Sequence, residues 1–278
     1  MLSIVIPTFN NLDYLKLCLM SLKKNSKYQH EIIIHINDGS DGTLTYIKSQ
    51  NIKYTYSKNN IGLCSGINSA VKLTDSNYIL YSHDDMYFCP EWDVELIKEI
   101  QMIKHENFYL SGVMIQKNNG HINFDCGNTI NNFDEKKLLK NYKNINCYNQ
   151  QGSHFAPHII TKNLWNKVKG FSEDFNPGIG SDPDFNMKLW KEGVRIFKGL
   201  NNFKVYHFGS LTTRKKKNLI QNRGDKTFLK KWGITTKFFK KHYLKSKTKY
   251  DGPLHEPNVT PGYILGLLSC KIQSIFTF

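Results

Sequence analysis

Residues 77–86, NYILYSHDDM, join a run of apolar and aromatic residues to two adjacent aspartates. The run is typical of a short buried strand, and the polar HDD (83–85) marks where that strand ends. Similar strand-like runs come earlier in the chain, at 2–6 (LSIVI), 31–36 (EIIIHI) and 52–57 (IKYTYS). The segment therefore predicts the last of four strands, with two carboxylates at its carboxyl end.

The segments between these strands have helical patterns. Apolar residues recur at helical spacing in 11–24, and helices are also expected at about 42–49, within 59–73 and at about 91–105. Alternation of strand and helix predicts a mostly parallel sheet with helices on both faces. Ligands of such sheets bind beyond the carboxyl ends of the strands, where NDGSDG and HDD both lie. The expected fold class is therefore α/β, with a Rossmann-like nucleotide-binding core.

The pattern changes after about residue 107. FYLSGVMI (108–115) and HINFDCG (121–127) flank the turn KNNG and predict a hairpin. Further helices are predicted at 160–171 and 182–193, and two short strands at 194–199 and 203–209. This half is expected to add a small antiparallel part to the sheet. The tail after residue 210 is basic and is predicted to be partly helical.

Positive charge is concentrated near the C-terminus. The chain has a net charge of +15, and residues 214–249 contain 14 Lys or Arg against one acid, Asp225. Because the remainder is near neutral, this segment indicates a local anionic partner: a membrane surface, a diphosphate or an acidic glycan. The other interpretation is a solvated, Lys-rich face. Nucleic-acid binding is suggested by the charge alone, and no recognition motif supports it.

The sequence predicts a cytoplasmic protein. The N-terminal MLSIVIPTFN lacks the features of a secretory signal, and no apolar run reaches the roughly 18–20 residues that span a bilayer. Six widely spaced cysteines without a CxxC pair argue against zinc and fit a reducing setting. The C-terminal GYILGLLSCKIQSIFTF (262–278) has three interpretations: docking on the core, pairing with a second subunit as a homodimer, or contact with a membrane.

Two acidic signals lie at the ends of predicted strands. Asp84 and Asp85 repel each other unless a cation lies between them, and Mg²⁺ and Mn²⁺ prefer oxygen ligands that they share with phosphates. The pair therefore predicts a metal and diphosphate site, against the alternative of a solvated loop or a helix N-cap. Asp38 in NDGSDG either accepts hydrogen bonds from a base or ribose, or belongs to a capping turn.

Two further signals come later in the chain. Asp182 and Asp184 start a predicted helix whose dipole favours the charged carboxylate, so Asp182 is either a general base or a cap. Pro183 fits the first helical turn. His207 ends a predicted strand, and its interpretations are a metal ligand, a phosphate donor or a core histidine.

These signals occur in one order, and the ordered set resembles the family 2 glycosyltransferases, which have the GT-A fold. The resemblance covers about residues 1–233, and the ordered set is specific although each motif is loose. Its motifs are VIPTFNN (5–11), INDGSDG (36–42), NNIGLCSGINSA (59–70), ILYSHDDM (79–86), KVKGFSEDF (167–175), GSDPDFNMKLWKEG (180–193), VYHFGSLTT (205–213) and KKWG (230–233).

The resemblance implies a nucleotide site near the ends of the first strands. Asp38 would contact the base, typically uracil, and Asp84 would face the donor ribose or sugar. The implied residues of the nucleotide site are Pro7, Thr8, Asn10, Asp38, Asn60, Gly62, Asn68 and Asp84.

The resemblance also implies a metal site and a catalytic base. Asp85 would be the direct ligand of Mn²⁺ or Mg²⁺, with His207 assisting, and Asp182 would be the catalytic base. The sequence departs from the family pattern at two places. His83 stands where the metal motif often begins with Asp, and Ser181 replaces the Glu that usually precedes the base, so unusual acceptor recognition is expected.

The implied reaction is a single displacement with inversion at the anomeric carbon. A sugar would pass from a nucleotide diphosphate, with UDP favoured, to a hydroxyl of a glycan, lipid-linked or protein acceptor. Residues 214–217 (RKKK) would close over the diphosphate. The alternative is a catalytically silent nucleotide-sugar or glycan-binding module. Ser181 favours that alternative, whereas Asp85 together with Asp182 argues against it.

The expected organisation is a GT-A catalytic domain at 1–210 followed by a basic C-terminal extension at 211–278. Within the domain, a nucleotide-binding half (about 1–105) precedes an acceptor half (about 106–210). The extension is expected to offer peripheral membrane contact, and no nucleic-acid partner is expected.

Overall fold

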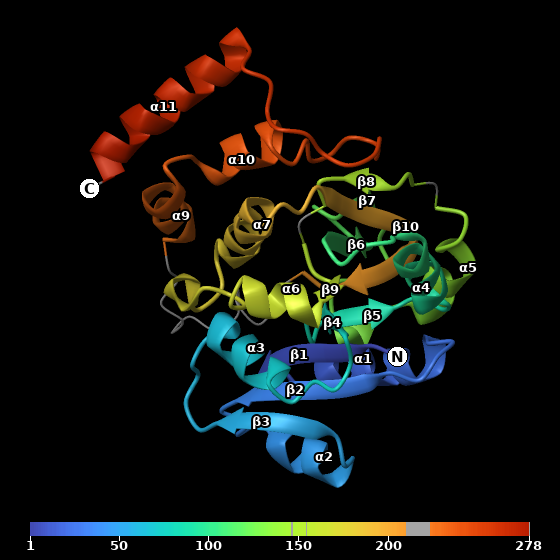
Figure 1. Ribbon diagram of the computed structural model, residues 1–278. Coiled ribbons are helices and arrows are strands. Elements are labelled where there is room, and N and C mark those ends of the chain that lie inside the picture. Colours follow the sequence, from blue (N-terminus) through green and yellow to red (C-terminus); the bar gives the residue numbers. More distant parts are fainter. Residues whose placement is uncertain (146, 154, 210–222, 278) are drawn as a thin grey trace.

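A ten-stranded mixed sheet with flanking helices forms the centre of the molecule (Figure 1). The structure is a computed structural model that describes residues 1–145, 147–153, 155–209 and 223–277, and these are the residues over which the strands are counted. The elements of the first half are β1 (Ser3–Phe9), α1 (Leu12–Asn25), β2 (Glu31–Asn37), α2 (Thr43–Ser49), β3 (Lys53–Ser57), α3 (Leu63–Val71), β4 (Tyr78–Tyr81), β5 (Met86–Phe88) and α4 (Trp92–Met102).

The second half supplies the remaining strands and several short helices. Its elements are β6 (Phe108–Gln116), β7 (Ile122–Asn123), η1 (Ile130–Asn132), α5 (Glu135–Asn141), β8 (Gln150–Gln151), β9 (His158–Thr161), α6 (Lys162–Lys167), η2 (Glu173–Phe175), α7 (Ser181–Lys191) and β10 (Ile196–His207).

The strand order confirms the expected α/β fold. The strands follow the order β3-β2-β1-β4-β9-β6-β10-β5, with β7 beside β6 and β8 beside β10. The first four run parallel, as alternation of strand and helix predicts. The antiparallel part comes from β9, which opposes both β4 and β6, and from the pairs that β10 forms with β5 and β8.

The hairpin predicted around KNNG is wrong. β7 pairs with β6 in parallel, with Ile122 opposite Ile115. The N–H of Met114 donates to Nδ1 of His121 at 2.9 Å, so the side chain of a loop residue and not a returning strand satisfies this donor. The chain therefore loops back after Gln116 and runs forward beside β6.

The two short strands predicted at 194–199 and 203–209 are also wrong as separate elements. They form one 12-residue strand, β10, with a register shift against β6 between Leu200 and Lys204. Both segments pair with the same neighbour, so the irregular residues between them bulge without ending the strand.

The C-terminal tail is helical, as its sequence predicts. It contains α9 (Gly224–Trp232), α10 (Thr236–His242) and α11 (Pro261–Thr277). Phe228 and Phe239, both fully buried, join the same hydrophobic core as the strands. Figure 1 shows α11 at the outer edge, beyond α10. Among the described residues, no helix combines the length and the apolar character needed to cross a bilayer.

Candidate active site

Four polar side chains pair where β1, β2 and β4 end. Thr8 Oγ1 donates to Asp84 Oδ2 at 2.6 Å, and Asn10 Nδ2 donates to Asp38 Oδ2 at 2.8 Å. Asn10 and Asp38 both have left-handed backbones, with φ of 46° and 65°. Such backbones are uncommon outside glycine and cluster at functional sites. The structure thus brings together four residues that the sequence assigned to the nucleotide site.

Three side chains bring potential metal ligands together beside this group. His207 Nε2 lies 3.3 Å from Asp85 Oδ1, and His83 Nδ1 lies 4.0 Å from the same oxygen. All three ligand atoms lie within 4.8 Å of one another. The other ring nitrogen of His207, Nδ1, lies 3.0 Å from Oε1 of Gln116, which orients the imidazole. His83, Asp85 and His207 therefore have the chemistry and spacing to hold one divalent ion.

The pairing of β5 with β10 explains this arrangement. Asp85 immediately precedes β5, and His207 at the end of β10 lies opposite Met86. The N–H of Phe208 donates to the carbonyl of Asp85 at 3.2 Å. Two residues far apart in sequence are thus fixed side by side by a backbone ladder.

Burial perturbs the titration of this group. Burial, together with the neighbouring Asp85, raises the pKa of Asp84 to about 7, and the hydrogen bond from Thr8 opposes that rise. Burial also lowers the pKa of His83 to about 4, against the attraction of Asp85. His83 is therefore neutral at pH 7 and keeps a lone pair for a metal ion. A cation here would also relieve the repulsion between Asp84 and Asp85.

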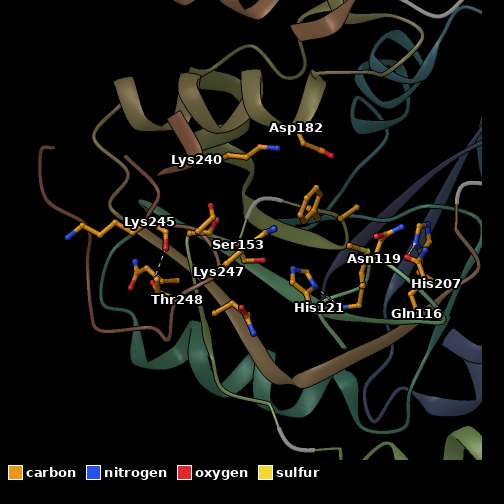
Figure 2. Close-up of a pocket in the computed structure, with 18 of the residues that line it drawn as sticks. Gln116, Asn119, His121, Ser153, Asp182, His207, Lys240, Lys245, Lys247 and Thr248 are labelled. Carbon is orange, nitrogen blue, oxygen red and sulfur yellow. Dashed lines mark hydrogen bonds between the residues drawn. The ribbon is translucent and has the colours of Figure 1, made fainter. Parts of the chain in front are cut away.

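Asp182, the predicted base, lies in the first turn of α7. Its Oδ1 is shielded from solvent and accepts no hydrogen bond from the described residues. Burial raises the pKa of Asp182 to about 7, and the positive charge of Lys240 opposes that rise. Figure 2 shows the Lys240 side chain extending toward Asp182. A carboxylate with a pKa near 7 suits general base catalysis at neutral pH.

A cavity of about 1290 Å³ joins the two candidate centres (Figure 2). Asp182 lines it, and so do His83 and His207 of the metal-ligand group. Lys240 on α10 and Gln116 at the end of β6 also line it. One space therefore has access to a potential metal site and to a potential base.

The sequence model of Glycosyl transferase family 2 matches residues 3–158, more than half of the chain. The chain belongs to this family. No protein of curated function matches the sequence of this family member.

Solved structures share the GT-A fold with this family member. S. aureus TarS 1–349 in complex with UDP is 18% identical with a TM-score of 0.55, over 74% of this chain and 59% of that one. GalNAc-T7 with UDP, GalNAc and Mn²⁺ is 15% identical with a TM-score of 0.57, over 74% of this chain and 43% of that one. TarS 1–349 in complex with UDP-GlcNAc is 14% identical with a TM-score of 0.55, over 99% and 81%. This family member thus spans less than two thirds of the length of the TarS 1–349 chain bound to UDP and of the GalNAc-T7 chain.

The other predicted nucleotide-site residues hold the junction before α3. Asn60 Oδ1 accepts the N–H of Gly62 at 2.9 Å. Gly62 has φ 86°, and a Cβ there would overlap Asn176 Oδ1. Asn68 exchanges hydrogen bonds with the backbone of Phe171, at 2.9 Å in each direction. These contacts tie α3 to the loops before α7, while the remaining predicted residue, Pro7, is buried within β1.

Asp184, the second carboxylate of SDPDF, has a structural contact instead. Its Oδ1 accepts a hydrogen bond from Trp232 Nε1 at 2.8 Å and an ion pair from Lys231 at 2.9 Å. Asp184 is fully buried, so this contact fastens α9 to α7. The KKWG motif of the family resemblance therefore supplies partners for Asp184.

Sequence reasoning missed Gln116 and Lys240 as site residues. Gln116 is a polar residue at the end of a buried strand. The same pattern pointed to Asp38, and it could have identified Gln116 from the sequence. Lys240 belongs to a helix whose contact with the site depends on the folding of the tail. Residues 214–217, predicted to cover the diphosphate, lie outside the described residues.

Proposed function

We propose that this chain is an inverting glycosyltransferase that moves a sugar from a UDP-sugar to an acceptor hydroxyl. The observation that carries the proposal is the single cavity shared by the His83–Asp85–His207 group and Asp182. Such a transfer needs a cation at the departing diphosphate and a base at the attacking hydroxyl, and both centres open onto this space.

In the proposed reaction, Asp182 takes the proton from the acceptor hydroxyl. The hydroxyl oxygen then forms a bond to the anomeric carbon of the donor sugar. The bond from that carbon to the phosphate oxygen breaks, and its electron pair leaves with UDP. Attack on the face opposite the leaving group inverts the anomeric configuration. The raised pKa of Asp182, about 7, supports its role as proton acceptor near neutral pH.

The ligand set fits Mn²⁺ better than Mg²⁺. Mg²⁺ favours oxygen ligands, whereas imidazole nitrogen suits transition metals, and here two imidazoles accompany one carboxylate. His83, Asp85 and His207 would hold the ion, and Gln116 would keep the His207 ring oriented. When bound, the ion would supply Lewis-acid stabilisation of the diphosphate charge.

The donor assignment draws on the residue pairs at the strand ends and on the related structures. TarS and GalNAc-T7 are described in complexes with UDP. Asp38, positioned by Asn10, would contact the base, and Asp84, positioned by Thr8, would face the ribose or sugar. Pro7, Asn60, Gly62 and Asn68 would shape the same side by fixing the backbone, as the family resemblance implies.

The remaining expectations stay proposals. We retain a catalytic domain at 1–210, with halves at about 1–105 and 106–210, and an extension at 211–278. We retain a cytoplasmic location with peripheral membrane contact through the C-terminal part. The acceptor would be a hydroxyl of a glycan, of a lipid-linked sugar or of a protein.

A nucleotide-binding and turnover assay tests the proposal. Thermal stabilisation by UDP should require Mn²⁺ and should disappear in Asp85→Ala. UDP release from a panel of UDP-sugars should fall about 10²- to 10⁴-fold in Asp182→Asn, with stabilisation by UDP and Mn²⁺ retained. Asp75→Asn is the matched control, because Asp75 is exposed and pairs with Lys53 at the amino end of β4.

Each contrary result has a definite meaning. Full turnover in Asp182→Asn would remove Asp182 as the base. Stabilisation by UDP and Mn²⁺ without turnover of any UDP-sugar would favour the silent binding module. No stabilisation by any nucleotide would contradict the donor site itself.

A further inference from the structure

The outer part of the cavity is lined by lysines from one short stretch of chain. They come from α10 and the loop that follows it, and they are Lys237, Lys240, Lys241, Lys245 and Lys247. Asp182 is the one carboxylate among the described residues that line this space. Five lysines and a single acid therefore line one concave site. Concave walls focus the field of like charges and concentrate ligands of opposite sign.

In the described part of the chain, these lysines lack close ion-pair partners, although Asp182 and Asp225 attract Lys240 from a longer distance. Within the described residues, none of the five forms an ion pair, whereas Lys231 pairs with Asp184 and Lys198 pairs with Glu99. The contrast is informative because acids elsewhere in the chain do pair with nearby lysines. The positive charge of the cavity is therefore available to a ligand.

The lysine-bearing loop is held firmly against the sheet. Ser246 Oγ donates to the carbonyl of Gly152 at 2.9 Å, and the N–H of Gln151 donates to the carbonyl of Thr248 at 2.8 Å. Lys245 and Lys247 have left-handed backbones, with φ of 49° and 71°. Side chains other than glycine, asparagine and aspartate rarely adopt such backbones, so the fold imposes the positions of both lysines.

The lysines lie away from the metal-ligand group. Figure 2 places His207 at one end of the cavity and Lys245 with Thr248 at the other, with Asp182 and Lys240 along one wall. A donor diphosphate at the His83–Asp85–His207 group would therefore leave Lys245 and Lys247 free. Their charge is placed for the second substrate, whose hydroxyl must reach Asp182.

Two aromatic rings line the same cavity. Phe155 and Tyr148 are 36% and 45% exposed, and the Lys240 ammonium lies 5.8 Å from the ring centre of Phe155. Exposed rings offer flat apolar surfaces on which the apolar faces of sugar rings can pack. A cavity lined by both aromatic rings and lysines matches a ligand built from sugars and negative charges.

We propose that the acceptor is an anionic glycan, one that carries phosphate or carboxylate groups, bound along the lysines of 237–247 with its hydroxyl at Asp182. This inference rests on the proposed transferase function and specifies its acceptor. The lysines select the charge, the aromatic rings hold the sugar units, and Asp182 receives the proton of the hydroxyl that is glycosylated.

Binding of charged and neutral oligosaccharides to the full chain tests the proposal. The probes are fluorescent oligogalacturonate for carboxylate, a phosphorylated mannan fragment for phosphate, and a neutral dextran fragment of equal length. We expect at least one charged probe to bind about tenfold or more tightly than dextran, with affinity falling as salt rises. The preferred probe distinguishes carboxylate from phosphate as the recognised group.

The variant Lys245→Gln/Lys247→Gln should bind the preferred charged probe about fivefold or more weakly than the parent chain does. Glutamine keeps a side chain at both left-handed positions, so the backbone strain is unchanged. Lys23→Gln/Lys48→Gln, with exposed lysines on α1 and α2, removes equal charge elsewhere and should bind like the parent.

Stabilisation by UDP and Mn²⁺ is measured on the same variants. If it persists while dextran binds as tightly as the charged probes, the anionic acceptor is overturned and the transferase proposal stands. Unchanged binding of the charged probe in the cavity variant would likewise overturn it. If stabilisation by UDP is absent in the parent chain, the transferase proposal itself fails.

Discussion

Asp182 experiences two opposing electrostatic effects. Burial disfavours its charged form and is the larger effect, so its pKa rises to about 7. The ammonium of Lys240 favours the charged form and limits that rise. The pKa of Lys240 is in turn lowered by its own burial, against the attraction of Asp182. The two groups therefore tune the fraction of Asp182 that can accept a proton near neutral pH.

The proposed transferase activity should depend on this titration. Only ionised Asp182 can act as a base, so kcat/KM should rise with pH up to about 7 and level off above it. Lys240→Gln removes a charge that lowers the pKa, so the rising limb should move to higher pH. A pH profile of UDP release measures the rise in the parent and its shift in Lys240→Gln. Lys226→Gln, which changes an exposed lysine of α9, is the control and should not shift the pH at which activity rises.

Asp84 also has a pKa of about 7, so the assignment needs the Lys240 variant. Lys240 is not among the groups that perturb Asp84. A limb that does not move in Lys240→Gln would therefore assign the titration to Asp84 or another group, and not to Asp182.

His83 departs from the family motif in sequence but lies among the potential metal ligands in the structure. In the sequence it departs from a metal motif that often begins with Asp. In the structure its ring nitrogen faces the same carboxylate oxygen as His207 does. The departure therefore exchanges an oxygen ligand for a nitrogen ligand within one potential site. Periodicity and motif spacing cannot show such a change, because it depends on the direction of a side chain.

At the scale of elements, the sequence predicted the parallel half of the sheet well. Apolar runs and helical spacing are strong local signals in 2–105, and β1 to β4 with their helices formed as expected. The failures lie where pairing partners decide the structure. β7 pairs with β6 in parallel, and His121 accepts a hydrogen bond from the backbone of Met114 in β6. β10 is continuous because both of its segments pair with β6, which is distant in sequence.

The candidate site shows the same division. Thr8, Asn10, Asp38, Asp84, Asp85, Asp182 and His207 were identified from motifs at element ends. For the lysines of 237–247, the sequence indicated only a net positive charge in 214–249. Their place in the cavity requires α10 and the loop after it to fold over β8. A contact between residues 94 positions apart, such as Ser246 and Gly152, leaves no pattern in either segment.

The hydrogen bond from Trp232 to buried Asp184 should strengthen the attachment of α9 to α7, in addition to the ion pair that Lys231 forms with the same carboxylate oxygen. Trp232→Phe keeps most of the ring packing but leaves a buried carboxylate oxygen of Asp184 without its indole donor. We expect a loss of about 1–3 kcal/mol in the free energy of unfolding. Urea denaturation measures this loss.

A double-mutant cycle separates this bond from changes in packing. Trp232→Phe and Asp184→Ala should show a coupling of about 0.5 kcal/mol or more, because each removes one partner of the same hydrogen bond. Additive effects would show that the bond contributes nothing beyond the packing of the ring.

At the scale of the whole molecule, the basic tail is divided between two surfaces. Its lysines of 237–247 line the cavity, while α11 lies beyond α10 at the outer edge (Figure 1). One side of α11 docks on α10. Cys270 is buried on this side, and the ring centres of Tyr263 and Phe238 lie 5.0 Å apart. The docking interpretation of the C-terminal segment therefore holds for this side of the helix.

The other side of α11 is apolar and exposed. Leu265 is 67% exposed, Ile275 72% and Phe276 82%. The large exposed side chains are Ile264, Leu265, Leu268, Ile272, Ile275 and Phe276. At 100° per residue they fall within roughly 120° of the helix surface. A continuous apolar face of this kind marks a membrane or protein interaction site. We favour a membrane surface, because lysines carry most of the charge of the neighbouring segment.

The membrane interpretation makes a specific prediction for Leu265→Glu. The full chain should sediment with vesicles that contain anionic lipid, and the variant should bind about tenfold more weakly, because burying a leucine side chain contributes roughly 1.5–3 kcal/mol. Gln273→Glu adds the same charge on a different side of α11 and should bind like the parent. Melting temperatures should be equal, since Leu265 is 67% exposed. If the parent ignores vesicles but its mass in solution is that of a dimer, and Leu265→Glu makes it monomeric, the apolar face joins two subunits and the membrane interpretation is wrong.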